Sequence, residues 1–309
     1  MRTQKLNIYG GKVKDGVSNE YKTKPDAFKS PVLHYVVGVR NTGKSYLTSL
    51  MLQQAKNDNL YDKVYLVSPS ANSNKAYFGK YVDDEDIFDP DDNAIKQVVD
   101  KVNIERDEFE DHLRKLEEWN NYKKHLKDNS VMEIPDNKLI EYMEMGFLDN
   151  MKPEWKYPIV RPPQSLMILD DVIGSQALSG RLLTKIATTN RHQGQLREPH
   201  SDRSALGLAV MILSQSYASN NLLARPVREN TSVITLFENK HQKQLEKIRD
   251  ELASVIDVEK FDKAYEYATA EKYGNLTIDF FPKSPEYQFR KNLNELIIFD
   301  ENKEIKNKK

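Results

Sequence analysis

The hydrophobic positions of this chain fall into six short runs that are apolar at almost every position and rich in valine and isoleucine. Strands that bury one face alternate apolar and polar residues, whereas continuously apolar runs are typical of strands buried on both faces. The runs therefore predict a central, mostly parallel sheet. They span His34–Gly38, Val64–Ser68, Ser165–Asp170, Leu208–Ser214, Ser232–Phe237 and Leu276–Phe280.

Segments with a helical pattern separate these runs. The alternation of strand and helix predicts an α/β domain of three layers, with helices covering both faces of the sheet. The helical segments are Ser45–Asn57, Leu178–Thr189, Asn220–Arg228 and His241–Ala253, of which the third has the weakest pattern.

The alternation is interrupted between about residues 71 and 163. This interval opens with seven carboxylates between positions 83 and 92 and continues with a long, highly charged helix. The apolar residues of that helix recur every three, four or seven positions, which places them in a narrow stripe along one side. We interpret the interval as a helical insertion, either a charged lid on the core or an arm that docks another protein. The stripe consists of Val98, Val102, Phe109, Leu113, Leu116 and Trp119.

These patterns divide the chain into parts. We expect residues 1–30 to form an N-terminal extension, residues 31–70 and 164–285 the core, residues 71–163 the insertion, and residues 286–309 a tail. The lysine-rich end of this tail is either a frayed terminus or a short DNA-binding arm.

Composition narrows the chemistry. None of the 309 residues is cysteine, which excludes disulfides, iron–sulfur clusters, thiolate zinc sites and a cysteine nucleophile. Lysine and arginine (46) nearly balance aspartate and glutamate (47), so any contact with nucleic acid must be local. The longest apolar stretch, Ala205–Leu213, is far shorter than the roughly 20 residues of a membrane helix, so we expect no stable membrane insertion.

The first predicted strand leads directly into a complete G-x-x-x-x-G-K-S motif, and a predicted helix begins at the end of that motif. Such a loop turns backbone N–H groups toward phosphates, and the helix N-terminus adds partial positive charge. Lys44 is expected to reach the β- and γ-phosphates of ATP, and Ser45 to hold Mg²⁺. The predicted nucleotide-binding residues are Gly38, Arg40, Asn41, Thr42, Gly43, Lys44, Ser45 and Tyr46.

Two carboxylates, Asp170 and Asp171, end the strand that follows the insertion. In a P-loop domain this is the Walker B position, where Asp170 is expected to bind the Mg²⁺ shell and Asp171 to orient or deprotonate the attacking water. Gln215 ends the next strand and is predicted to sense the γ-phosphate, unless it is a locally satisfied amide. The order predicts a P-loop NTPase of the additional-strand type, and the lack of an N-K-x-D motif disfavours a GTPase.

Arginine is the remaining requirement of phosphoryl transfer. Negative charge grows on the γ-phosphoryl group in the transition state, and an arginine, often from a neighbouring subunit, stabilises it. Arg228 is the favoured candidate and Arg191 the second, while Arg225 lies close to the first in sequence.

A polar loop at residues 195–203 precedes the predicted sensor strand. Its side chains Arg197, His200 and Arg203 are candidates for contact with DNA phosphates. A plain surface loop is the alternative interpretation.

Taken in order, the motifs resemble those of the viral DNA-packaging ATPases of the FtsK-HerA superfamily, the type found in poxviruses, other large DNA viruses, virophages and tailless phages. The resemblance covers residues 32–281 without the insertion. It rests on GVRNTGKS, VYLVSPS, LMILDD, TNRHQG, AVMILSQS, RPVRENTSVITLF and YEYATAEKYGNLTID.

This resemblance implies ATP-driven translocation of double-stranded DNA into a preformed capsid. It further implies a homo-oligomeric ring of five or six subunits, ATP and Mg²⁺ as cofactors, and a capsid vertex or portal protein as partner. The expected location is the host cytoplasm or a viral factory, at the capsid during packaging. By the same resemblance, Arg228 or Arg191 acts in trans, and Gln215 is the sensor.

One departure and two alternatives remain open. Many motors of the wider superfamily have glutamate where this chain has Asp171, so its role as the base is open. The first alternative function is a conjugation or helicase-type DNA motor of the same ATPase class. The second is an ATP-gated capsid assembly scaffold whose charged insertion docks a capsid or membrane protein.

Overall fold

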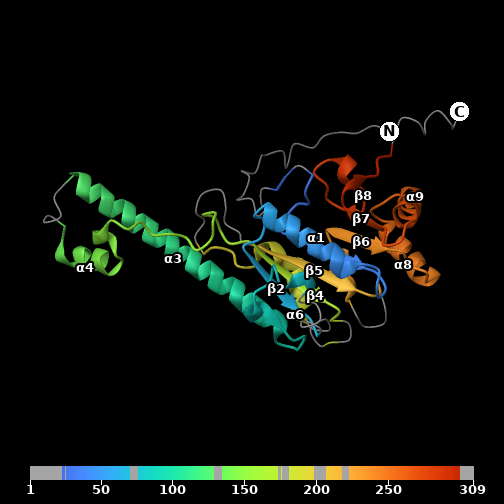
Figure 1. Cartoon of the computed structure of the whole chain (residues 1–309), viewed down its shortest axis with the longest axis horizontal. Helices are drawn as coiled ribbons and strands as arrows, with labels where there is room; N and C mark the ends of the chain where they lie inside the picture. Colours follow the sequence, from blue (N-terminus) through green and yellow to red (C-terminus); the bar gives the residue numbers. More distant parts are fainter. Residues whose placement is uncertain are drawn as a thin grey trace, which may run out of the picture.

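A nine-stranded sheet organises the computed structural model of this chain (Figure 1). The structure describes residues 23–24, 26–69, 76–128, 134–172, 175, 181–197, 207–217 and 223–299. The strands, in chain order, are β1 (Leu33–Val37), β2 (Lys63–Val67), β3 (Ile87–Phe88), β4 (Ser165–Asp170), β5 (Leu208–Ser214), β6 (Val233–Phe237), β7 (Asn275–Asp279), β8 (Phe289–Lys291) and β9 (Glu295–Leu296).

The sheet has the order β3-β2-β4-β5-β1-β6-β7-β8-β9. The first six strands of this order run parallel, and the last three are added antiparallel. All six predicted strands are confirmed to within one residue at each end. Because β5 lies between β1 and β4, the additional-strand arrangement is confirmed as well.

Helices cover both faces, which confirms the predicted three layers. They are α1 (Lys44–Asn57), α3 (Ala94–Asp128), α4 (Asp136–Glu144), α6 (Arg181–Thr189), α7 (Arg225–Glu229), α8 (Gln242–Leu252) and α9 (Val258–Thr269). Short 3₁₀ helices are η1 (Asp84–Asp86), η3 (Phe147–Asp149), η4 (Asn190–His192) and η5 (Pro285–Tyr287). The weakly patterned helix predicted over Asn220–Arg228 corresponds to the short α7, and residues 220–222 of that prediction lie outside the described residues. Helix α9 was not predicted.

Alternate residues of each buried strand face the two helical layers, because successive side chains of a strand point to opposite faces. In β1, Tyr35 packs in the cluster that includes α6, α8, α9 and the start of α3. Its neighbour Val36 packs in the cluster on the opposite face, with Leu47 of α1. No helix among the described residues is both long and apolar enough to cross a bilayer.

The insertion begins on the core and continues as an arm, whose far half does not cover the sheet as a lid would. Helix α3 has 35 residues, which gives it a length of about 50 Å, and its far half extends away from the sheet together with α4 (Figure 1). Only its first turns, including Val98 and Val102, belong to the main core. The far end has a small core of its own, formed by Trp119, Tyr122, Ile134, Tyr142 and Phe147.

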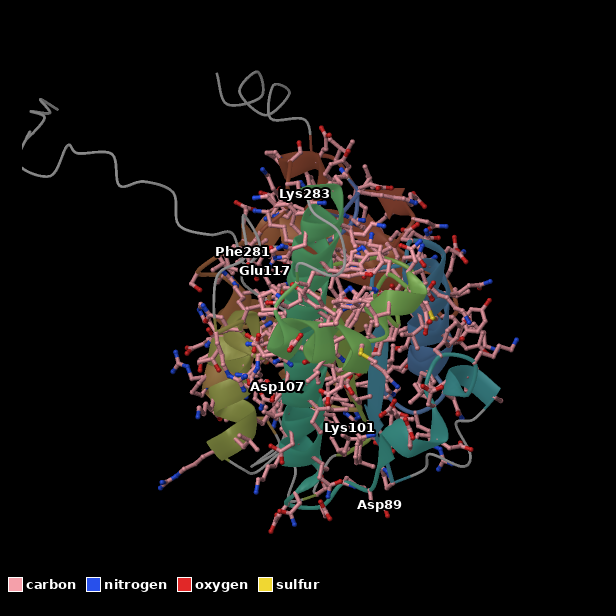
Figure 2. All side chains as sticks on the ribbon, turned by 90° about the vertical axis from the view of Figure 1, so that its left-hand side faces the viewer. Asp89, Lys101, Asp107, Glu117, Phe281 and Lys283 are labelled. Carbon is pink, nitrogen blue, oxygen red and sulfur yellow. The ribbon has the colours of Figure 1, made fainter. Side chains whose placement is uncertain are left out.

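One of the seven carboxylates between positions 83 and 92 has a structural role. Asp86 is buried at the root of the arm and accepts hydrogen bonds from Lys63 of β2 (2.8 Å) and Lys101 of α3 (2.6 Å). Figure 2 shows Lys101 near the root of α3 and the more exposed Asp89 below it. This buried carboxylate therefore joins the first turns of α3 to the edge of the parallel sheet.

Replacing Phe147 by alanine is expected to unfold the tip of the arm while the sheet stays folded. Phe147 has no exposed surface, and its ring lies 5.3 Å from that of Trp119 and 5.8 Å from that of Tyr142. Loss of such a ring costs about 3–5 kcal/mol, which is large for so small a cluster. Amide hydrogen exchange should become fast throughout α4 and remain slow in β1 and β5.

The exposed Met143 of α4 provides the control, because its truncation to alanine removes no buried contact. Slow exchange of α4 in the Phe147→Ala variant would show that the tip does not depend on this cluster.

Candidate active site

The loop between β1 and α1 forms one wall of the site, at the C-terminal edge of the parallel strands. The Gly38 N–H donates to the carbonyl of Ser214 at the end of β5 (3.0 Å), which fixes the start of the loop. Asn41 and Gly43 have φ angles of 64° and 100°, in the left-handed region that favours glycine. A Cβ atom added to Gly38 would lie 2.5 Å from Thr42 Oγ1, so the loop needs glycine there.

Lys44 is the first residue of α1, and its ammonium group bends back over the loop. It donates to the carbonyls of Gly38 (2.6 Å) and Val39 (3.1 Å). Burial lowers the pKa of Lys44, and the charges of Asp170 and Asp171 oppose this shift. Backbone carbonyls therefore hold the cation at the place where the loop motif puts phosphate oxygens.

Asp170 is the last residue of β4 and is buried, with 4% of its surface exposed. Burial and, to a smaller extent, the charge of Asp171 raise the pKa of Asp170 to about 6, although the charge of Lys44 opposes this shift. Among the described residues no group of three or more histidine, aspartate or glutamate side chains can hold a metal ion. The donors fit Mg²⁺, which is typically bound by one or two carboxylates, a hydroxyl, water and substrate phosphates. Asp170 and Ser45 would supply the protein ligands.

Asp171 leaves the strand in an unusual backbone conformation. Its φ angle is 51°, uncommon for a residue other than glycine, and its side chain is exposed. Gln215 Nε2 donates to Asp171 Oδ1 (2.8 Å). The predicted sensor amide therefore contacts the predicted Walker B carboxylate directly, across the ends of β4 and β5.

Arg228 is bound within its own chain. Its Nε and Nη2 atoms donate to the carboxylate of Glu251 on α8 (3.0 and 2.9 Å), and Nη1 donates to the carbonyl of Leu223 (2.5 Å). Only 9% of its side chain is exposed. Arg228 would reach a neighbouring subunit only after this ion pair separated, whereas Arg191 is exposed in η4. The structure therefore favours Arg191 over Arg228 for a role in trans.

Arg197 joins its loop to the arm. Its guanidinium group pairs with Asp107 (2.8 Å) and Glu110 (3.0 Å) of α3. The backbone N–H of Arg197 also donates to the Glu110 carboxylate. Figure 2 shows Asp107 along α3. Two carboxylates already compensate this charge, which argues against the predicted contact of Arg197 with DNA phosphates. The other two predicted DNA-binding residues, His200 and Arg203, lie outside the described residues.

The remaining predicted residues lie around the loop. Arg40 and Tyr46 are exposed, and Thr42 donates its hydroxyl to the carbonyl of Val39 (2.8 Å). The sequence reasoning missed Tyr273, which is 57% exposed and would lie 3.7 Å from a Cβ atom added to Gly43. It follows α9, and the only signal in the sequence is that it stands before a glycine in a turn. Its exposed ring can border a nucleotide held by the loop.

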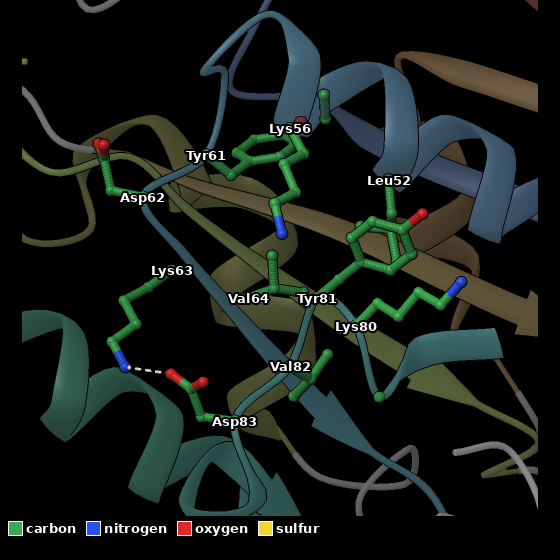
Figure 3. Close-up of a pocket in the computed structure, with 12 residues that line it drawn as sticks. Leu52, Lys56, Tyr61, Asp62, Lys63, Val64, Lys80, Tyr81, Val82 and Asp83 are labelled. Carbon is green, nitrogen blue, oxygen red and sulfur yellow. Dashed lines mark hydrogen bonds and ion pairs between the residues drawn. The ribbon is translucent and has the colours of Figure 1, made fainter. Parts of the chain in front are cut away.

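A separate cavity of about 270 Å³ lies at the other end of α1 (Figure 3). It is lined by the last turns of α1, the start of β2 and residues 79–83, and it includes the ion pair between Lys63 and Asp83. Because β2 begins there, the cavity opens at the N-terminal edge of the sheet. It is therefore distinct from the site at the phosphate-binding loop.

No family model and no curated protein matches this sequence. Solved structures similar to it include the genome packaging NTPase B204 from Sulfolobus turreted icosahedral virus 2 in complex with ATP-γS (13% identity, 85% of this chain and 97% of that chain, TM-score 0.42). Another is the DNA-packaging ATPase B204 from Sulfolobus turreted icosahedral virus (11% identity, 84% of this chain and 96% of that chain, TM-score 0.41). A third is the pCW3 conjugation coupling protein TcpA (12% identity, 90% of this chain and 65% of that chain, TM-score 0.41).

Asp170→Asn is expected to stabilise the protein against urea at pH 7.5 but not at pH 4, when EDTA keeps Mg²⁺ away. The folded state raises the pKa of Asp170 to about 6, so it binds the proton more tightly than the unfolded state does. The free energy of unfolding of the parent therefore falls as the pH rises from about 4 to 6, by about 1–3 kcal/mol. Asparagine removes this loss.

The exposed Asp250 of α8 gives the control variant Asp250→Asn. Equal stabilisation by Asp170→Asn at both pH values would contradict the raised pKa of Asp170 in the folded state.

Proposed function

We propose that this protein is an ATP-hydrolysing motor that moves double-stranded DNA, and specifically one that packages a viral genome into a preformed capsid. One observation carries the catalytic part of the proposal. Lys44, the pair Asp170 and Asp171, and Gln215 come from three segments far apart in the sequence and lie at one edge of three adjacent strands. This is the arrangement that cleavage of a terminal phosphoanhydride bond requires.

In the proposed reaction, Lys44 exchanges its bonds to the loop carbonyls for bonds to phosphate oxygens. Mg²⁺, when bound by Ser45 and Asp170, neutralises charge on the phosphates. Asp171 orients the attacking water and accepts its proton. The aspartate is shorter than the glutamate of many related motors, and the left-handed backbone of Asp171 together with the bond from Gln215 directs its carboxylate away from the strand.

The DNA-moving and capsid-docking parts rest on the motif resemblance and on two features of the fold. We propose a ring of five or six subunits in which Arg191 completes the site of a neighbour, because its side chain is exposed. We further propose that the tip of the arm docks the capsid vertex or portal protein, in the host cytoplasm or a viral factory. The tip exposes four large apolar side chains that such a partner would cover: Ile140, Met143, Leu148 and Met151.

Steady-state ATP hydrolysis at high protein concentration should increase when linear duplex DNA is added. Lys44→Ala removes the phosphate-binding cation and should lower the rate by about 10²-fold or more, with and without DNA. Lys56→Ala, at the far end of the same helix, is the matched control and should hydrolyse ATP at the parental rate. Hydrolysis that ignores duplex DNA would favour an assembly scaffold, and separation of the strands of a flanked duplex would favour a helicase.

Arg191→Ala should lose most DNA-stimulated hydrolysis and regain it in mixtures with Lys44→Ala. If the arginine acts on the neighbouring subunit, a ring of both variants contains interfaces at which an intact Lys44 faces an intact Arg191. The rate of the mixture should then exceed the sum of the two separate rates. A mixture no faster than that sum would place Arg191 outside the reaction.

A further inference from the structure

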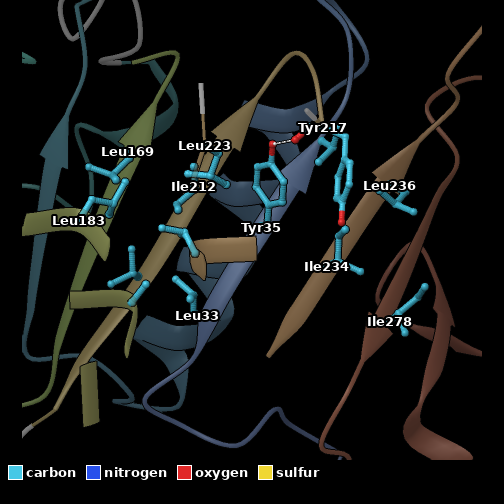
Figure 4. Packing of buried hydrophobic residues seen from close by; sticks show 14 of the residues in the cluster. Leu33, Tyr35, Leu169, Leu183, Ile212, Tyr217, Leu223, Ile234, Leu236 and Ile278 are labelled. Atoms are coloured by element: carbon cyan, nitrogen blue, oxygen red, sulfur yellow. Dashed lines mark hydrogen bonds between the residues drawn. The ribbon is translucent and has the colours of Figure 1, made fainter. Parts of the chain in front are cut away.

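The three residues that follow β5 are fixed by the strand that leads to the phosphate-binding loop. Tyr35 of β1 is 1% exposed, and its hydroxyl donates to the carbonyls of Ser216 (2.8 Å) and Tyr217 (2.9 Å). The Ser214 hydroxyl also donates to the Ser216 carbonyl (2.6 Å). These bonds fix the backbone on the C-terminal side of Gln215, as Figure 4 shows for the tyrosine pair.

The side chain of Tyr217 extends this network toward two helices. Its ring lies 5.8 Å from the ring of Tyr35 and 5.5 Å from the guanidinium carbon of Arg228. Its hydroxyl donates to Glu251 (2.8 Å), the same carboxylate that binds Arg228 through two nitrogens. Glu251 on α8 therefore joins α7 to the segment that carries Gln215.

The charges of this network favour its assembled form. Hydrogen bonds from Arg228 and Tyr217 lower the pKa of Glu251 despite its burial, so the carboxylate is ionised at neutral pH. Arg228 is nearly buried and Glu251 is partly exposed, and apolar residues of the same volume often stabilise a fold as well as such an ion pair does. The pair bonds Tyr217, which stands two residues after the sensor Gln215, and this position points to a role in the site.

We infer that Glu251 and Tyr217 are positioning residues that hold the Gln215 amide against Asp171, so that displacement of α7 or α8 changes the rate of hydrolysis. The connection runs from Glu251 to the Tyr217 hydroxyl, along the backbone to Gln215, and from its amide to Asp171. The kinetic consequence rests on the proposed ATPase activity, whereas the structural connection does not.

Tyr217→Phe removes only the hydroxyl that bonds Glu251 and keeps the ring between Tyr35 and Arg228. We expect kcat for ATP to fall by about 3- to 10-fold, the effect of one lost hydrogen bond, with KM for ATP within about twofold. In a Gln215→Ala background the same change should lower kcat by less than about 1.5-fold, because the group it positions is gone. Glu251→Ala should show the same dependence.

Asp262→Asn is the matched control, since it breaks the ion pair of α8 with α9 through Arg249 and touches no sensor residue. It should leave kcat unchanged. Equal effects of Tyr217→Phe with and without Gln215 would overturn the inference and give the network a structural role alone.

Amide hydrogen exchange tests the connection without catalysis. The segment 214–217 should exchange faster in Tyr217→Phe and Glu251→Ala than in the parent and in Asp262→Asn. Unchanged exchange would overturn the inference even if the parent hydrolyses ATP. If the parent hydrolyses no ATP but the segment exchanges faster in these two variants than in the parent, the result would support the positioning and refute the proposed function.

Discussion

The placement of β5 between β1 and β4 is the constraint on which the site depends. Parallel pairing puts Ser214 beside Val37 and Leu213 beside Asp170, so the ends of all three strands reach the same edge. Neighbouring strands lie about 4.8 Å apart, which leaves a gap of roughly 10 Å between the phosphate-binding loop and the Walker B carboxylate. This gap suits a phosphate group with its metal ion. Gln215, which follows the end of β5, borders the gap with its side-chain amide.

The central strands and the loop were predictable from sequence because their signals are local. Each buried strand is a continuous apolar run, and the loop motif occupies eight consecutive residues. The partners of the arginines were not predictable in this way, because they depend on tertiary structure. Arg197 meets carboxylates 87 and 90 residues away, and Arg228 meets Glu251 on a helix two elements later. Strands β8 and β9 have three and two residues and lack a readable pattern.

The insertion illustrates a second limit of sequence patterns. Its apolar stripe predicted that one side of a helix would be buried, but not against what. In the structure the stripe meets three different partners in succession. Val98 packs in the main core, Phe109 packs with Leu196 and Trp155, and Trp119 packs in the cluster at the tip. One apolar stripe thus packs against the main core at the root, against Leu196 and Trp155 in the middle, and within the separate cluster at the tip.

The long helix of the arm also has a mechanical consequence. Its buried root lies against β2, which pairs with β4, the strand that ends in Asp170. About 40 Å of helix separates that root from the tip, so the helix is a lever with a long outer limb and a short inner one. A weak sideways force on the tip produces a larger force at the root, and the root then moves less than the tip. A small shift of the sheet edge would therefore move the tip several times as far, by about the ratio of the two limbs.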